Sequence, residues 1–350
     1  MSDQKFYLHI GTHKTATTTI QKTVRKNRKQ LLSEDGIKWI ELQDFPRLKE
    51  LMKLEAHSAA IEQELMGFIK AVTAGHKGDF LLSYEGLSGS PAGFYINNAF
   101  IAPILKTAFT GFQAEVIAMV RRQDEFIQSI FTQNFHANTY EASISEFYAE
   151  KDLNHLDWNT FIKPYVEAFG VENIHAFPYD RELLRDHSPL ALINTVIGSN
   201  VLAGIDSLED ANVGFSDAAR KISQDVRPYL NDWQNGQIRK GLQSVANKGK
   251  LSEYNILDQE SKQKLIARFA PSNKAFFDKY IPKAYGMSGF SEPVFEKAEE
   301  LSELESYKLL VVHLAGRLPE GKLPKHEKKI SLTERLSKKM KSVIKHGSKR

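Results

Sequence analysis

The chain has 350 residues, 41% of them hydrophobic and 26% charged, which is the composition of an ordinary globular protein with a sizeable core. It contains no cysteine, which excludes disulfides, thiolate metal sites and a cysteine nucleophile. Residues 322–350 hold eleven Lys and Arg against two Glu, a local net charge of +9, so the preceding residues carry −5 and give no support to a nucleic-acid-binding domain.

Strand and helix patterns alternate over the first 200 residues. Short apolar runs predict strands at 5–11 (KFYLHIG), in the IKWI stretch after Gly36, within 78–86, at 114–120 and at 173–179. Helical spacing of apolar residues predicts helices at about 17–32, 46–74, 97–109, from the RRQDE stretch to about 135, and at 157–169. Strands that alternate with helices in this way predict an α/β fold with a central parallel sheet flanked by helices.

The strand pattern stops after about residue 188. Helices are predicted near 189–197, 216–233, 258–270, 272–285 and 295–312, followed by a Lys-rich and weakly amphipathic tail. We therefore expect one domain over 1–290, with an α/β core over about 1–200 and a helical part over about 200–290. A helical, Lys-rich C-terminal tail is expected over 291–350.

The stretch HIGTHKTATTT, residues 9–19, leaves the first strand and opens a helix. Ligands of open parallel sheets bind beyond the carboxyl ends of the strands, and a helix N-terminus there favours an anion. Lys14 adds a full positive charge, and Thr15, Thr17 and Thr18 add hydroxyl groups. A phosphate-like group is the predicted ligand. The stretch lacks the GxxxxGK[ST] order of a standard P-loop, and a threonine-rich helix cap with a solvated lysine is the competing interpretation.

A second stretch, MVRRQDEFIQSIF (119–131), also leaves a strand and opens a helix. Arg121 stands at the exit of the strand, and Ser129 follows eight residues later. The planar guanidinium of arginine suits phosphate oxygens, and a serine on the same side could add a hydroxyl donor. Taken alone, this spacing favours the competing interpretation of a solvated arginine pair and a solvated helix serine.

Together the two stretches resemble the PAPS-dependent sulfotransferases, in particular a bacterial branch of that family with a P-loop-like three-layer fold. The resemblance implies that 3′-phosphoadenosine 5′-phosphosulfate (PAPS) is the donor and PAP the product. It also implies binding of the 5′-phosphosulfate by the first stretch and of the 3′-phosphate by Arg121 and Ser129. The residues expected to bind the donor are His13, Lys14, Thr15, Ala16, Thr17, Thr18, Arg121 and Ser129.

Two positions depart from the pattern of the family. Ala16 stands where the family usually has glycine, which permits unusual dihedral angles and close approach to a ligand. Alanine is the smallest replacement, so we expect function to survive if the backbone at Ala16 is right-handed. Gln123 stands where many relatives have proline, and the RRQ version is similar to the bacterial branch.

The resemblance implies transfer of a sulfuryl group to an acceptor hydroxyl by in-line attack, with Lys14 stabilising charge on the leaving group. A general base must take the hydroxyl proton. Glu85, at the exit of the strand within 78–86, is the first candidate, and His136, near the end of the helix that carries Ser129, is the second. An exposed turn glutamate and a surface histidine are the competing interpretations. His13 is expected to contact the acceptor.

The acceptor cannot be deduced from short motifs, and a carbohydrate or glycolipid is expected. No metal is expected. The alternatives are a P-loop-type kinase of nucleotides or small molecules, and an inactive nucleotide- or sugar-binding protein on the same fold. The sequence has no signal-peptide pattern and no apolar run long enough to cross a membrane. A cytoplasmic protein is therefore expected, with weak contact between its basic tail and the inner membrane surface as a further hypothesis.

Overall fold

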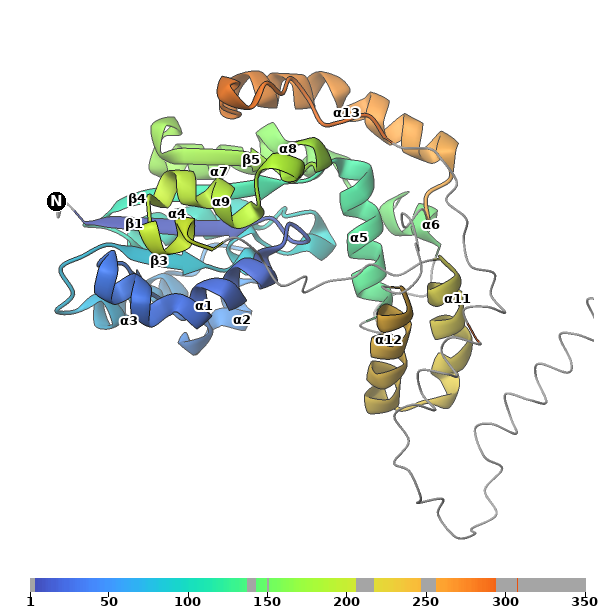
Figure 1. Ribbon diagram of the computed structural model, residues 1–350, viewed down its shortest axis with the longest axis horizontal. Helices are drawn as coiled ribbons and strands as arrows, with labels where there is room; N and C mark the ends of the chain where they lie inside the picture. The colour runs from blue at the N-terminus through green and yellow to red at the C-terminus, as the bar shows by residue number, and fades with distance from the viewer. Residues whose placement is uncertain are drawn as a thin grey trace, which may run out of the picture.

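The computed structural model describes residues 4–136, 143–149, 151–205, 217–246, 256–293 and 307. Its centre is a sheet of five parallel strands in the order β2-β3-β1-β4-β5 (Figure 1). The strands are β1 (Lys5–Gly11), β2 (Lys38–Trp39), β3 (Phe80–Ser83), β4 (Gln113–Val120) and β5 (Ile174–Pro178). The predicted parallel α/β fold is confirmed.

Alternation along the strands produces two hydrophobic layers. In β1, Phe6, Leu8 and Ile10 face one cluster of buried residues, and Tyr7 faces the other. The first cluster is covered by α3 (Ala59–Thr73), α4 (Asn98–Ala108), α5 (Gln123–His136), α6 (Ile144–Ala149) and α7 (Trp158–Phe169). The second is covered by α1 (Thr17–Glu34), α8 (Arg181–Asp186), α9 (Pro189–Ile197) and α10 (Asn200–Ala203). The sheet is thus the middle of three layers, as a P-loop-like fold requires.

The strand order determines where a ligand can bind. The chain places β2 and β3 on one side of β1, and then crosses to add β4 and β5 on the other side. Such a reversal leaves a crevice beyond the carboxyl ends of the central strands. The parallel pairs His9–Ser83 and Gly11–Ala118 bring the exits of β1, β3 and β4 to the same edge. The two predicted motifs leave the sheet at this edge.

Four predicted helices are different in the structure. The range 46–74 contains α2 (Leu48–Leu51) and α3, separated by a turn before Ser58, which caps α3. The range 216–233 contains α11 (Asp217–Val226) and the start of α12 (Asp232–Ala246), which lie apart from the sheet in Figure 1. The two helices predicted on either side of residue 271 form one continuous helix, α13 (Gln259–Tyr280), with Pro271 inside it.

The segment 256–293 packs back onto the start of α5. Gln123 and Asn273 exchange two amide hydrogen bonds of 2.8 and 3.0 Å. Arg122 donates a hydrogen bond to the carbonyl oxygen of Ser291 at 2.7 Å, and the backbone N–H of Ser291 donates to Asp180 at 2.9 Å. The last part of the described chain therefore supports the junction between β4 and α5. Residues 295–312, apart from 307, and the basic tail lie outside the described residues, so the domain division stays a prediction.

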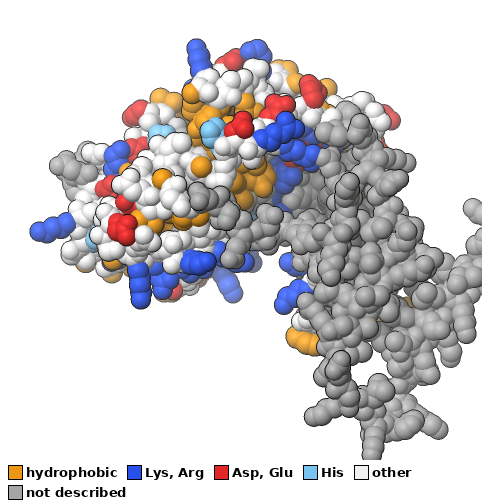
Figure 2. Space-filling model, in the orientation of Figure 1, with side chains coloured by type: hydrophobic (Ala, Val, Ile, Leu, Met, Phe, Trp, Pro, Cys, Tyr) orange, Lys and Arg blue, Asp and Glu red, His pale blue; other side chains and the backbone are white. Residues whose placement is uncertain are grey.

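The described part of the chain contains no helix that is long and apolar enough to cross a membrane. On the face drawn in Figure 2, Lys and Arg side chains gather along the lower edge of the α/β body, where Figure 1 places α1 to α3. Helix α1 alone carries five Lys and Arg between residues 22 and 29.

Candidate anion-binding site

The loop from Thr12 to Ala16 is held tightly against the end of the sheet. Thr12 donates its backbone N–H to the carbonyl of Met119 in β4 at 2.6 Å. The hydroxyl groups of Thr15 and Thr17 both donate to the carbonyl of Thr12, at 2.6 and 3.4 Å. These two threonines are buried, and Thr18 is exposed. The hydroxyl protons of Thr15 and Thr17 thus stabilise the loop itself, whereas Thr18 is accessible to a ligand.

The backbone of the loop is left-handed at two residues that are not glycine. Lys14 has φ 65° and Ala16 has φ 62°, with Thr15 between them outside the positive range. Function was expected to survive on the condition that the backbone at Ala16 is right-handed, and the structure does not meet that condition, because Ala16 is left-handed. Alternation of handedness along a short run turns successive N–H groups toward one side and forms a concave anion site. Alanine keeps that shape at some conformational cost.

The N-terminus of α1 follows this loop and is open to an anion. Ala16 is its N-cap and provides no side-chain acceptor, and the first turn contains no acidic residue. The first N–H groups of a helix have no partner within the helix, and they carry the positive end of its dipole. Such a terminus, beside a lysine, favours a phosphate or sulfate group.

The second motif meets the first in space. Arg121 Nη1 lies 3.5 Å from the carbonyl oxygen of Lys14, although the two residues are 107 positions apart. Arg121 also stacks over the ring of Tyr179, and its Nε donates to Glu125 at 2.8 Å. Arg122, by contrast, points inward to Asp124. The structure therefore selects Arg121 as the arginine of this pair that faces the loop.

Ser129 follows Glu125 by one helical turn on α5. Arg121, Glu125 and Ser129 are spaced by four residues, so they lie along one side of the helix and its N-terminal extension. Burial would raise the pKa of Glu125, but the charges of Arg121 and Arg122 lower it. Glu125 is therefore a carboxylate that holds Arg121 in place, and a bound anion would share the guanidinium with it.

Lys14 lies in a cationic environment. Burial and the charges of Arg121 and Arg239 lower the pKa of Lys14, and Glu85 acts in the opposite direction. Arg239 belongs to α12, beyond the end of the helix predicted there, and sequence reasoning missed it. It lies in no recognisable motif, and only the fold brings it near the loop. An anion that neutralises these like charges would relieve their repulsion.

Glu85 lies next to the start of the loop. It opens the 3-10 helix Glu85–Ser88 after β3, and Gln21 of α1 donates to its Oε2 at 2.9 Å. Gly11 has φ 83°, and a Cβ there would lie 3.1 Å from the Cβ of Glu85. Only glycine fits this position without strain. Glu85 is thus fixed between β1 and α1 within electrostatic reach of Lys14.

The two candidate histidines differ in what the structure describes. His136 is the last residue of α5, and its side chain lies outside the described part of the chain, so its role as a base stays a prediction. The backbone N–H of His13 donates to the hydroxyl of Tyr95 at 3.0 Å. Burial and the charge of Lys14 lower the pKa of His13 to about 4, so its ring is neutral at pH 7.

Within the described residues, no group of three His, Cys, Asp or Glu side chains is placed to hold a metal ion. A cavity of about 450 Å³ lies at the other end of the sheet, lined by residues that include Lys5, Glu115, His175 and Tyr280. Its lining includes neither Lys14 nor Arg121. The candidate site is an open edge at the helix terminus and is separate from this cavity.

Comparison with known proteins gives a distant structural match. No family model and no curated protein matches the chain. Among solved structures, a sulfotransferase from Alicyclobacillus acidocaldarius is similar with 13% sequence identity and a TM-score of 0.36, over 68% of this chain and 97% of that chain. Similarity at this level assigns neither activity nor site residues. The functional argument therefore rests on the geometry of the site.

Proposed function

We propose that this protein is a PAPS-dependent sulfotransferase that acts on a hydroxyl group of a carbohydrate or glycolipid. The observation that carries the proposal is the contact of Arg121 with the carbonyl of Lys14 at the open N-terminus of α1. A lysine, an arginine and free helix N–H groups suit a ligand with several separated anionic groups, which PAPS has.

PAPS supplies the sulfuryl group when it is bound. In the proposed reaction, the acceptor oxygen forms a bond to sulfur as the bond from sulfur to the 5′-phosphate oxygen breaks. Lys14 neutralises the charge that develops on that phosphate oxygen, and Glu85 takes the proton of the acceptor hydroxyl. Arg121 and Ser129 bind the 3′-phosphate. The loop N–H groups and Thr18 bind the 5′ end of the donor.

The test of the donor is thermal stability with PAP and with ATP. A ligand of the native state at a hundred times its Kd stabilises the fold by about 2.7 kcal/mol, so PAP is expected to raise Tm by several degrees. ATP lacks the 3′-phosphate and should raise Tm far less. Arg121→Gln should abolish most of the PAP effect. Arg47→Gln is the matched control, because Arg47 pairs with Glu50 and Glu64 and with no residue of the loop.

Other outcomes of this experiment would favour the alternatives. Equal stabilisation by ATP and PAP would favour a P-loop-type kinase. Stabilisation by PAP without PAP production from PAPS, on any of a panel of mono- and oligosaccharides, would favour a nucleotide-binding protein that lacks activity. Unchanged stabilisation in Arg121→Gln would contradict the proposed role of that residue.

The role of Glu85 is tested by Glu85→Gln. Glutamine keeps the size of the side chain and removes its basicity, so PAP formation from PAPS should fall by roughly a hundredfold or more while PAP affinity changes little. His136→Asn should cost far less activity. Normal turnover in Glu85→Gln would rule out Glu85 as the base and favour His136.

The acceptor class, the cytoplasmic location and the weak membrane contact of residues 322–350 stay predictions. The basic tail lies outside the described residues, and its charge is the argument for attraction to an anionic surface.

A further inference from the structure

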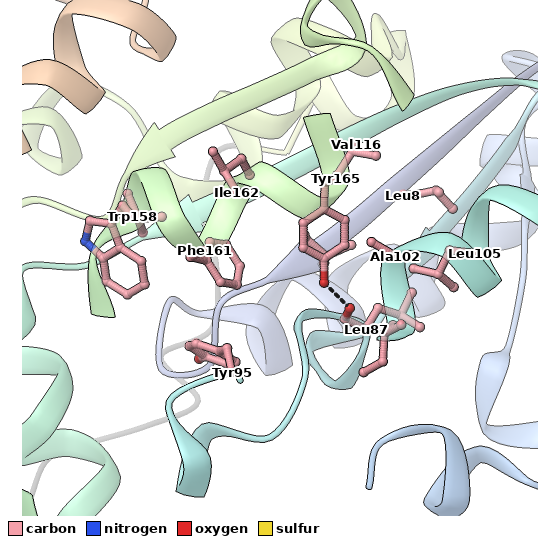
Figure 3. Packing of buried hydrophobic residues seen from close by; sticks show 14 of the residues in the cluster. Leu8, Leu87, Tyr95, Ala102, Leu105, Val116, Trp158, Phe161, Ile162 and Tyr165 are labelled. Carbon is pink, nitrogen blue, oxygen red and sulfur yellow. Dashed lines mark hydrogen bonds between the residues drawn. The ribbon is translucent and has the colours of Figure 1, made fainter. Parts of the chain in front are cut away.

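Two consecutive aromatic residues have an unusual backbone beside the candidate site. Phe94 has φ 51° and Tyr95 has φ 69°, and the left-handed region is unfavourable for bulky residues. Both side chains are buried, and the ring of Tyr95 lies 5.6 Å from that of Phe126. Its ring also lies 5.1 Å from that of Phe161 (Figure 3). The core packing stabilises a conformation that directs Tyr95 to the β1–α1 loop.

The hydroxyl of Tyr95 makes two contacts with a single residue of that loop. It accepts the backbone N–H of His13 at 3.0 Å and lies 3.3 Å from Nδ1 of the same residue. Burial raises the pKa of Tyr95, so the phenol keeps its proton. A buried phenol proton needs an acceptor, and a hydroxyl that already accepts an N–H still has that proton to donate.

The acceptor of the phenol proton decides the tautomer of His13. The hydroxyls of Thr12 and Ser88 lie near Tyr95 and influence its pKa. Each donates its own proton to a carbonyl, of His13 and of Glu85, and its oxygen keeps lone pairs that are weaker acceptors than a bare imidazole nitrogen. Within the described residues, His13 Nδ1 is the acceptor at hydrogen-bond distance from the phenol oxygen, at 3.3 Å. Nδ1 then carries no proton, and the proton of the neutral ring is on Nε2.

We propose that Tyr95 is a positioning residue that fixes His13 as the Nε2–H tautomer, so that His13 offers an uncharged hydrogen-bond donor to the anion bound beside Lys14. The role of His13 as a hydrogen-bond donor to the ligand rests on the proposed function. The tautomer of His13 does not depend on that function. In this tautomer the bare nitrogen of His13 faces Tyr95, so His13 cannot serve as the general base.

The tautomer is tested by nitrogen NMR of protein with labelled histidine, with the His13 signal assigned by its loss in His13→Asn. The expected spectrum shows an Nε2–H imidazole that does not titrate between about pH 5.5 and 8. A proton on Nδ1, or titration in this range, would overturn the proposal. The wild-type protein alone gives this answer.

Tyr95→Phe removes the hydroxyl and should give a mixture of the two tautomers. Tyr165→Phe is the matched control, because Tyr165 is equally buried and donates its hydroxyl to the carbonyl of Leu87 at 2.6 Å (Figure 3). Tyr95→Phe loses both contacts with His13 and Tyr165→Phe loses one buried hydrogen bond, but Tyr165→Phe should leave the His13 signal unchanged. The same change in both variants would mean that the effect is a general loosening of the core.

The affinity for PAP tests whether His13 donates a hydrogen bond to the ligand. In His13→Gln the amide places an N–H near the position of Nε2, whereas in His13→Asn it lies near Nδ1. The Kd of PAP should rise by roughly tenfold or more in His13→Asn and by much less in His13→Gln. Equal and unchanged affinity in both variants, with binding lost in Lys14→Met, would overturn the donor role and leave the proposed function intact. If the wild-type protein does not bind PAP, the proposed function fails, and the NMR result still decides the tautomer.

Discussion

His9 is buried in the middle of β1, where its Nδ1 contacts the hydroxyl of Ser83 at 2.7 Å. Its Nε2 is buried and has no hydrogen-bond partner among the described residues. Burial lowers the pKa of His9 from 6.5 to about 4. Between these values the unfolded chain binds a proton at His9 that the native chain does not bind. The free energy of unfolding therefore rises with pH between about pH 4 and 6.5, and it decreases again as the pH falls through this window.

This linkage can be measured. We expect the free energy of unfolding, measured with urea at several pH values between 5 and 6, to rise less steeply with pH in His9→Leu than in the wild-type protein. The difference should be about 1.4 kcal/mol per pH unit, since one proton is removed from the linkage. His57→Gln is the control, because its side chain is 51% exposed. An unchanged slope in His9→Leu would show that His9 is protonated in the native state.

Ala16 allows a second test at the scale of one residue. A left-handed backbone costs alanine about 1–2 kcal/mol, and glycine recovers part of this at the expense of greater freedom in the unfolded chain. We expect Ala16→Gly to raise the free energy of unfolding by about 1 kcal/mol. Ala267→Gly, on an exposed position inside α13, should lower it by about the same amount. Destabilisation in both variants would contradict the left-handed conformation of Ala16.

Helix α13 shows how tertiary contacts override local sequence signals. Pro271 removes one backbone donor and normally ends a helix, which is why the sequence predicts two helices there. The structure continues the helix because its next turn is held from outside. Asn159 donates to the carbonyl of Ser272 at 2.8 Å, and Asn273 bonds to Gln123.

The amide pair of Gln123 and Asn273 is expected to stabilise the attachment of α13 to α5. Removal of one partner leaves a buried amide without its acceptor or donor, so Asn273→Ala and Gln123→Ala should each cost roughly 1–3 kcal/mol. The double variant should cost clearly less than their sum, by about 1 kcal/mol or more. Lys274 and Asp278 form the control cycle on the same helix, since this exposed pair should show a coupling of only a few tenths of a kcal/mol. Additive effects at Gln123 and Asn273 would contradict the bond.

The sequence predicts the strands, and it predicts that the two loops of the candidate site leave them at one edge of the sheet. Buried parallel strands are short apolar runs, and their exits must lie at one edge, so Lys14 and Arg121 could be expected to meet. The positions of Arg239 and Tyr95 could not be predicted. Arg239 reaches the site through the packing of a separate helix pair, and Tyr95 reaches it through a strained turn that only a completed core stabilises.

At the scale of the whole molecule, the β4–α5 junction beside the candidate site is held by residues from distant parts of the chain. Arg122 bonds to the carbonyl of Ser291, 169 residues later in the sequence. Ser291 also bonds to Asp180, and Lys262 lies 4.0 Å from Asp124. The β4–α5 junction thus depends on contacts with the segment 256–293.

This arrangement has a consequence for the order of events during biosynthesis. At roughly 5–20 residues per second, Ser291 is made on the order of ten seconds or more after Arg122. Through that interval the sheet has its central strands, but Arg122 and Asp124 lack the partners that the C-terminal segment supplies. The nascent chain therefore has the complete sequence of both loops, and the partners of Arg121 at Lys14, Glu125 and Tyr179, before the segment 256–293 can add its contacts with Arg122 and Asp124.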